Sequence, residues 1–305
     1  MHSNDRVQFA KPDLALLAEN HTVVDLHFHS TYSDGLNRIP KIAARARKLG
    51  IGIAITDHNE IRGALEIEQY DDLLTIPGIE LTVAEGSHLL VYFYTTKALR
   101  RFYEKEVAPH MGQGVMHSLR LTMVEAIERA RRYDCVIIFP HPYCAMYTGI
   151  CNVQFSEAQV GRMLETVDGV EVINANNMSK WNLKCAVLGF NLGKAMVGGS
   201  DGHALHHMGR AVSFADCAAN RHDFLDAVRH HANQVVGKEI PLLHKVTTNG
   251  LKIRKSIGNC PDLFEKNIRY GRTFINAKSK ALCGRIQRRV GQHVKTQDLW
   301  SHFGM

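Results

Sequence analysis

The chain has 305 residues, a formal net charge of +7, 45% hydrophobic residues and 22% charged residues. These proportions are typical of a soluble globular protein and exclude a mainly disordered chain. The first 20 residues contain no apolar signal sequence, and no later apolar run has the length of a membrane span. We therefore expect a cytoplasmic protein without a transmembrane segment.

Short apolar runs alternate with segments of helical period through most of the chain. The runs predict strands at 23–27, 52–56, 75–81, 89–94, 136–140, 170–174, 195–199 and 211–215. Helical spacing and capping residues predict helices at 39–49, 123–133, 160–167 and 221–231. Such alternation is typical of βα units, which build a parallel sheet or a β/α barrel.

A cluster of possible metal ligands follows the first predicted strand, in the stretch DLHFHSTYSDG at residues 25–35. Alternate side chains of a strand point to the same face, so we expect Asp25, His27 and His29 to project together. Asp34 precedes a glycine that suits a turn, which would fold this carboxylate back toward the two imidazoles. A single His-x-His pair is a weak signal, so its meaning depends on the rest of the chain.

Similar side chains stand at the ends of other predicted strands. They are Asp57 and His58 after 52–56, Glu80 in 75–81, His141 after 136–140, and Asp201 and His203 after 195–199. The carboxyl ends of the strands form the active face of a β/α barrel, so we expect these residues to converge. His88 stands instead at the start of strand 89–94, which fits a strand that runs back from the same rim.

Six motifs occur in order along the chain: DLHFHSTYSDG, AITDHN, PGIEL, GSHLLVYF, FPHP and GGSDGH. Together they resemble the motifs of the polymerase-and-histidinol-phosphatase (PHP) family of metal-dependent phosphoesterases, over roughly residues 22–218. The resemblance implies an α/β fold, a distorted (β/α)7 TIM-like barrel. It also implies up to three metal ions held by nine protein ligands.

The resemblance assigns these ligands residue by residue. His27, His29, Glu80 and Asp201 would bind the first ion; Glu80, His88 and His141 the second; and Asp34, His58 and His203 the third. All nine positions carry the expected residue types, although the spacing from Glu80 to His88 is short. Six imidazoles with three carboxylates suit two to three divalent Zn, Mn or Fe ions.

The same positions suggest catalytic and substrate-binding roles. We expect Glu80, His203 and Asp57 to take part in catalysis. Asp25 and Asp57 flank the ligands, where each would either orient an imidazole or make ordinary strand-end hydrogen bonds. Phosphate oxygens need further donors, and Arg210, Lys180 and Asn177 follow the strand ends where they could supply them.

The positive charge is concentrated at the C-terminal end. Residues 245–305 contain 13 Lys and Arg against three acidic residues, whereas residues 1–244 contain 24 against 27. We therefore divide the chain into a lead-in (1–21), the barrel (22–244) and a basic extension (245–305). Leu282, Ile286 and Val290 predict a helix in the extension. This helix would bind nucleic acid, an anionic surface or a partner, or lie solvated on the barrel.

These features predict a phosphoesterase in which a metal-bound hydroxide at a trinuclear centre attacks phosphorus. The expected substrate is a phosphomonoester of a nucleotide or another small metabolite. One alternative is a nuclease of the same family acting on oligonucleotides, with the basic extension holding the substrate. Another is a non-catalytic, metal-stabilised interaction module, for which loss of ligands would be the sign. None of the nine is lost.

Overall fold

The computed structural model describes residues 6–144, 148–151, 155–241, 244, 245, 247 and 248. The chain divides into one unit of residues 1–252 and a second of residues 253–305, and all described residues belong to the first. The helix predicted around Leu282, Ile286 and Val290 lies outside the described residues. The extension 245–305 and the other proposed boundaries therefore stay predictions.

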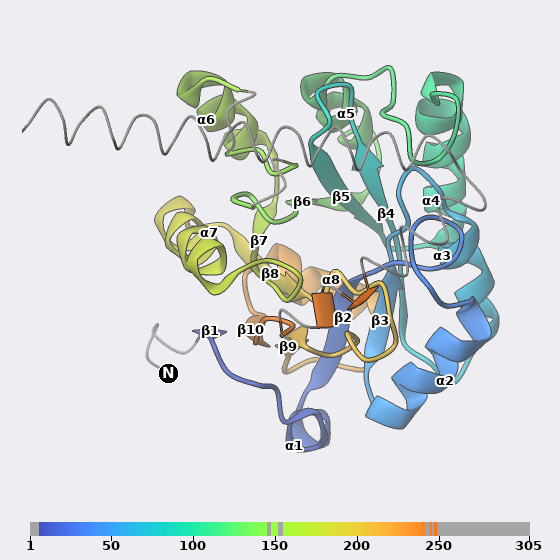
Figure 1. Cartoon of the computed structure of the whole chain (residues 1–305), viewed down its shortest axis with the longest axis vertical. Coiled ribbons are helices and arrows are strands. Elements are labelled where there is room, and N and C mark those ends of the chain that lie inside the picture. The colour runs from blue at the N-terminus through green and yellow to red at the C-terminus, as the bar shows by residue number, and fades with distance from the viewer. Residues whose placement is uncertain (1–5, 145–147, 152–154, 242–243, 246, 249–305) are drawn as a thin grey trace, which may run out of the picture. The chain divides into compact units, whose positions relative to one another are not determined.

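The described residues form one curled, ten-stranded sheet in the order β1-β10-β9-β2-β3-β4-β5-β6-β7-β8 (Figure 1). Its strands are β1 (Val7–Gln8), β2 (Thr22–Phe28), β3 (Gly52–Ile55), β4 (Thr75–Thr82), β5 (His88–Phe93), β6 (Cys135–Phe139), β7 (Gly169–Asn174), β8 (Ala195–Gly199), β9 (Ala211–Ala215) and β10 (Gln234–Gly237). The predicted strands match β2 to β9 within one or two residues. The short strands β1 and β10 were not predicted, and β1 lies within the predicted lead-in.

The strand directions bring the possible ligands to one rim. Strands β2, β3 and β4 are parallel, β5 is antiparallel to both neighbours, and β6, β7 and β8 are again parallel. The carboxyl ends of six strands therefore share an edge of the sheet, and β5 begins there with His88. The antiparallel strands β5 and β9 distort an otherwise parallel sheet.

The sheet curls until the segment after β8 reaches the end of β2. Phe28 and Gly202 form a parallel bridge there, and the backbone N–H of His29 donates to Gly202 O at 2.9 Å. This TIM-like half-barrel confirms the predicted PHP-type α/β fold.

The helices pack around the sheet, with α2, α3 and α4 along one side, α7 beside β7 and β8, and α8 against the inner face (Figure 1). They are α1 (Leu14–Asn20), α2 (Ile39–Leu49), α3 (Arg62–Glu66), α4 (Thr96–Phe102), α5 (Met123–Ala130), α6 (Glu157–Thr166), α7 (Ser179–Leu192) and α8 (Arg221–Arg229), with shorter helical turns at Ile67–Gln69, Tyr103–Val107 and Ala108–His110. The capping box predicted for α5 is present, because Thr122 and Glu125 bond reciprocally.

The sheet has two apolar layers, one on its outer face and one on its inner face, and polar residues occupy the rim. The outer layer packs helix side chains such as Ile39 and Ile42 against the sheet. The inner layer joins strand residues such as Val24 and Ile76 to Phe224 of α8, near the amino ends of the parallel strands. The inside of the barrel is therefore apolar at one end, and its polar centre lies at the other.

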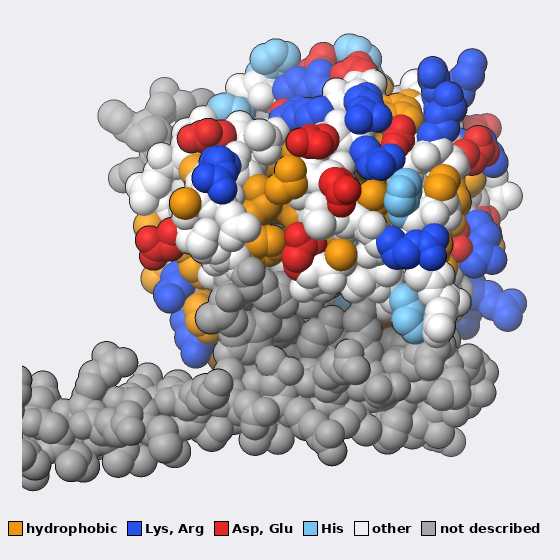
Figure 2. All heavy atoms as spheres, turned by 90° about the horizontal axis from the view of Figure 1, so that it is seen from above, with side chains coloured by type: hydrophobic (Ala, Val, Ile, Leu, Met, Phe, Trp, Pro, Cys, Tyr) orange, Lys and Arg blue, Asp and Glu red, His pale blue; other side chains and the backbone are white. Residues whose placement is uncertain are grey.

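The exposed face in Figure 2 mixes basic and acidic side chains without a large area of one sign. This distribution agrees with the nearly balanced charge of residues 1–244. Among the described residues, no helix has both the length and the apolar character needed to cross a membrane.

We expect Gly199→Ala to lower the free energy of unfolding by about 1–3 kcal/mol, because overpacking a dense core costs that much. A Cβ at Gly199 would lie 2.4 Å from the Cβ of His27 and 2.8 Å from its backbone nitrogen. Gly161→Ala in α6 is the matched control, since no atom lies within 4 Å of its Cβ. This control should be neutral or slightly stabilising. Equal urea midpoints for the two variants would contradict the close packing of β8 on β2.

Candidate metal centre

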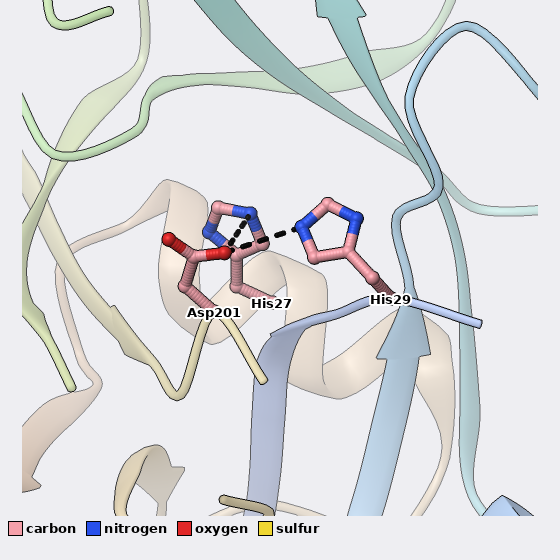
Figure 3. Close-up of side chains that lie close together, drawn as sticks. All are labelled: His27, His29 and Asp201. Carbon is pink, nitrogen blue, oxygen red and sulfur yellow. Dashed lines mark ion pairs between the residues drawn. The ribbon is translucent and has the colours of Figure 1, made fainter. Parts of the chain in front are cut away.

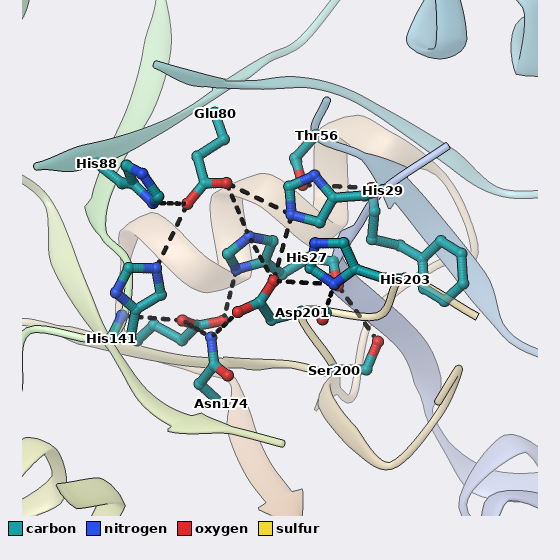
Figure 4. A network of polar contacts seen from close by, with 12 residues as sticks. His27, His29, Thr56, Glu80, His88, His141, Asn174, Ser200, Asp201 and His203 are labelled. Atoms are coloured by element: carbon teal, nitrogen blue, oxygen red, sulfur yellow. Dashed lines mark hydrogen bonds and ion pairs between the residues drawn. The ribbon is translucent and has the colours of Figure 1, made fainter. Parts of the chain in front are cut away.

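All nine predicted ligands meet at the rim of the sheet, and Figure 4 shows seven of them together. Their ligand atoms form four groups, within each of which all atoms lie within 4.8 Å of one another. The groups are His27, His29 and Asp201; His29, Asp34 and His203; His29, His58 and Glu80; and Glu80, His88 and His141. Residues from 27 to 203 in the chain thus form one continuous centre.

Glu80 is the shared carboxylate of this centre and is 1% exposed. Its two oxygens lie close to five imidazoles, at 3.4 Å from His27 Nε2, 3.4 Å from His29 Nε2, 3.2 Å from His58 Nδ1, 3.0 Å from His88 Nδ1 and 3.4 Å from His141 Nε2. The alternation of β4 explains its direction, because Ile76 points into the inner apolar layer and Glu80 is four residues further along the same face.

Asp201 closes the group around the two histidines of β2. Its Oδ1 lies 3.7 Å from His27 Nε2 and 3.3 Å from His29 Nε2, as drawn in Figure 3. Its carboxylate is supported from the other side by Asn174, whose Nδ2 donates to Asp201 Oδ2 at 3.3 Å.

Asp34 reaches the centre through the predicted turn. The N–H of Gly35 donates to Ser30 O at 2.8 Å, and a Cβ at Gly35 would lie 2.2 Å from the carbonyl oxygen of His29. Asp34 Oδ2 then lies 2.9 Å from His203 Nε2, and Oδ1 lies 3.6 Å from His29 Nδ1 but 4.0 Å from His58 Nε2. By distance, His58 therefore belongs with Glu80 more closely than with Asp34.

Three rim residues have positive φ angles, a backbone conformation that residues other than glycine rarely adopt. The φ angles of Asn59, His141 and Asp201 are +48°, +32° and +47°. Such conformations cost free energy and persist where the surrounding structure enforces them. Two of these residues are predicted ligands. The third, Asn59, accepts a hydrogen bond from the Thr82 N–H and donates to two carbonyls of the loop at 115–117.

The expectation that Asp25 projects with His27 and His29 is wrong. The pairing of β2 with β3 shifts register between Asp25 and Phe28, which inserts an extra residue in β2 and changes the face of the side chains that follow. The Asp25 carboxylate instead accepts hydrogen bonds from the backbone N–H groups of Ser200 and Gly209, both at 2.9 Å. These two hydrogen bonds hold residues 200 and 209, which follow β8, against β2.

Asp57 does not orient an imidazole either, which corrects one of the two roles considered for it. Its carboxylate accepts hydrogen bonds from Ser30 N at 2.7 Å, Ser30 Oγ at 2.6 Å and Ser33 Oγ at 2.6 Å. Asp57 is fully buried and holds the turn that delivers Asp34. These contacts give Asp57 a positioning role, and the catalytic role expected for it stays a prediction.

Glu171 in β7 orients the imidazole of His27 and was missed by sequence reasoning. Its Oε1 lies 3.0 Å from His27 Nδ1, while Oε2 accepts from the His141 N–H at 2.9 Å and from Asn174 Nδ2 at 2.8 Å. A carboxylate on one ring nitrogen leaves the other nitrogen to act as a ligand. The available signal was an acidic residue between Val170 and Val172 in a strand expected to be buried.

The charges of the centre shift its pKa values strongly. Burial alone would raise the pKa of Glu80, but the nearby imidazoles of His88, His58 and His27 hold it well below the usual range. Burial alone would likewise lower the pKa of His27, but the charges of Glu80, Glu171 and Asp201 raise it well above its ordinary value. Buried carboxylates that stay ionised beside several imidazoles are typical of a cation-binding site.

Two observations indicate that the residues of this centre suit divalent metal ions. His27 Nε2, His29 Nε2 and Glu80 Oε1 are buried yet have no hydrogen-bond partner among the described residues, and such atoms normally have one. In addition, two ligands about 2.1 Å from one tetrahedral ion are about 3.4 Å apart. That spacing matches the 3.3–3.4 Å between His29 Nε2 and the oxygens of Asp201 and Glu80.

Comparisons with known proteins agree with this centre. The model of the PHP domain matches residues 25–138, and the model of the PHP-associated region matches residues 181–233. Residues 25–138 belong to the PHP family. The PHP match ends at the close of β6, so it includes His27, His29, Asp34, His58, Glu80 and His88 but not His141, Asp201 or His203.

Three known proteins are similar to parts of this chain in sequence or in fold. The error-prone DNA polymerase of Symbiobacterium thermophilum is 34% identical over 96 residues, which cover 30% of this chain but only 9% of the polymerase. A two-domain protein from Bacteroides vulgatus, described as containing a predicted PHP-like metal-dependent phosphoesterase, has 17% identity and a TM-score of 0.55 over 78% of this chain and 70% of its own. The lesion-specific endonuclease PfuEndoQ from Pyrococcus furiosus has 20% identity and a TM-score of 0.57 over 70% and 57%. At these identities the structures share the fold.

The three predicted substrate contacts have separate surroundings in the structure. Lys180 is exposed and lies over the ring of Trp181 at 5.1 Å. The side chain of Asn177 is buried and donates to Tyr143 O at 2.7 Å, which ties two rim loops together. Arg210 lies near His206, whose pKa is lowered by burial and then by the charges of His244 and Arg210. Substrate contacts by these residues stay predictions.

We expect Glu171→Gln to weaken metal binding by about 10- to 100-fold, the usual effect of removing a carboxylate behind a ligating imidazole. Titration of the metal-free protein with Zn²⁺ or Mn²⁺ would measure the loss. Glu165→Gln on the exposed side of α6 is the matched control and should bind as the wild type does. Unchanged affinity in Glu171→Gln would contradict the orienting role.

Proposed function

We propose that the chain hydrolyses phosphate esters with two to three divalent Zn, Mn or Fe ions held by the nine side chains at the rim. The substrate in this proposal is a phosphomonoester of a nucleotide or another small metabolite. The observation that carries the proposal is the convergence of six imidazoles and three carboxylates around the buried Glu80. Membership of a family of metal-dependent phosphoesterases supports it.

The side chains of the centre differ in how far they are exposed to solvent. The side chains of His27, His29 and Glu80 are at most 1% exposed, whereas those of Asp34 and Asp201 are 13% and 15% exposed. The phosphate would approach from the Asp34 and Asp201 side, while the buried set fixes the positions of the ions. When bound, the ions would activate water and neutralise charge on the phosphate oxygens.

The roles of individual side chains follow from their contacts. Glu80 faces two groups of imidazoles and would hold both together as the shared ligand. His203 Nε2 faces Asp34 at the accessible side, where it would complete a third site. Glu171 would keep His27 oriented throughout the reaction. No protein nucleophile is needed in this scheme.

A phosphate-release screen tests the proposal directly. Protein loaded with Zn²⁺, Mn²⁺ or Fe²⁺ should release phosphate from at least one of a set of nucleotides, sugar phosphates, histidinol phosphate and short RNA. We expect Glu80→Gln to lower kcat at least 100-fold, because the shared ligand loses its charge, and Glu165→Gln to leave it unchanged. Metal binding without turnover on any ester would favour the non-catalytic interaction module instead.

A nuclease is the second candidate, and two observations favour it. Residues 245–305 carry 13 Lys and Arg against three acidic residues, and a basic segment is suited to the phosphate backbone of nucleic acids. The fold is also shared with a lesion-specific endonuclease. The basic extension would then hold the nucleic acid while the metal centre cuts it.

Salt dependence separates the two candidates. An oligonucleotide held by several cations should lose at least tenfold in affinity between 50 and 200 mM NaCl, because bound cations release counterions from the nucleic acid. Deletion of residues 253–305 should weaken that binding further. A small phosphomonoester should respond to neither change by more than about twofold. Measurements of KM for both substrate types on the full chain and the deletion variant would decide between the candidates.

A further inference from the structure

The chain returns to the rim after β10. The N–H of Lys238 donates to Arg210 O at 2.9 Å, and the N–H of Ile240 donates to Ala175 O at 2.7 Å. Ile240 is buried, so this path is part of the packed structure. The described residues that follow, 244, 245, 247 and 248, lie next to the loops that carry Asn177 and His207.

Lys245 stands at the end of a short chain of hydrogen bonds from the metal centre. Its ammonium donates to Asn177 O at 2.7 Å. The N–H of Asn177 donates to Asn174 Oδ1 at 3.0 Å, and Asn174 Nδ2 donates to Asp201 Oδ2 at 3.3 Å. The turn at residues 174–177 therefore connects the lysine to a predicted metal ligand.

A second contact fixes the same segment on the loop of another predicted ligand. Thr248 is buried, and its Oγ1 lies 3.3 Å from His207 Nε2. The other nitrogen of that ring, Nδ1, accepts a hydrogen bond from the His203 N–H at 3.3 Å. The segment of Lys245 and Thr248 thus contacts both the turn at residues 174–177 and the loop that carries Asp201 and His203.

The surroundings of Lys245 leave its charge without an ion-pair partner in direct contact among the described residues. The ammonium instead donates to a neutral carbonyl. Burial lowers the pKa of the ammonium, and the charges of Glu239 and then Asp201 act in the opposite direction. The geometric link between the lysine and Asp201 is the chain of hydrogen bonds through Asn177 and Asn174. An ammonium has three N–H donors, and it bonds an anionic oxygen more strongly than a carbonyl.

Two other cations near the rim, Arg62 and Lys180, have different surroundings. Arg62 donates to the carboxylate of Glu60 from Nε at 2.7 Å, and its Nη2 lies 2.6 Å from the same carboxylate. Lys180 is exposed over Trp181. Lys245 differs from both, because its bond leads through two asparagines to the metal centre.

We propose that Lys245 binds a non-bridging oxygen of the substrate's phosphate group at the Asp201 side of the metal centre. The contact with Asn177 O holds the ammonium in place before the substrate arrives. This inference rests on the proposed phosphoesterase function and adds a substrate-binding residue to it. It also gives the segment after β10 a role in selecting phosphate esters.

Phosphate binding to the full chain loaded with Mn²⁺ tests the proposal, with inorganic phosphate as the probe in a calorimetric titration. We expect Lys245→Met to raise the Kd for phosphate about tenfold, or about 1.4 kcal/mol, while the bound metal per chain stays unchanged. Lys245→Arg should restore most of the affinity. Lys238→Met, an exposed lysine earlier on the same segment, should bind phosphate as the wild type does.

Three outcomes would overturn the proposal. The first is a Kd in Lys245→Met within twofold of the wild-type value. The second is loss of metal from that variant, which would show that the lysine only stabilises Asp201. The third is a metal-loaded wild type that binds no phosphate. A wild type that binds phosphate through Lys245 but hydrolyses no ester would contradict the proposed function alone.

Discussion

The position of the Glu80 carboxylate is the constraint on which the rest of the centre depends. A buried carboxylate costs several kcal/mol unless it is paired, and Glu80 is 1% exposed with nitrogens of five imidazoles within 3.0–3.4 Å of its oxygens. These imidazoles come from β2, the loop after β3, the start of β5 and the loop after β6. The carboxylate therefore requires four separate parts of the sheet to meet at one point. Divalent ions between these groups would compensate the burial of so many polar atoms.

The fold supports this arrangement by separating an apolar end from a polar end. Phe224 of α8 fills the barrel beside inner strand residues near the amino ends of the parallel strands. At the opposite rim, Asn59, His141 and Asp201 adopt positive φ angles that are costly for their residue types. The packed end can stabilise such strain. Asp25 and Asp57 add to that support, because each buried carboxylate binds backbone or hydroxyl groups that hold a ligand-bearing loop.

The accessible side of the centre includes later parts of the chain besides Asp34. Asp201 follows β8, and the residues after β10 return to the loops beside it. In a β/α barrel the loops at this rim vary most easily without disturbing the core. Substrate selection is therefore expected to lie in these loops and in the segment around Lys245, while the groups shared by Glu80 determine metal binding.

Much of this protein follows from its sequence. Alternating apolar runs predict β2 to β9, and the residues at their rim ends include all nine side chains of the centre, which the resemblance to the PHP family separated from neighbours such as Asp25 and Asp57. Tertiary structure alone decides the rest. A register shift in β2 turns Asp25 away from the histidines, and β7 brings Glu171 onto His27 from 144 residues away. Neither the pairing register nor a contact at that separation is encoded in local periodicity, since both depend on how strands pack against one another.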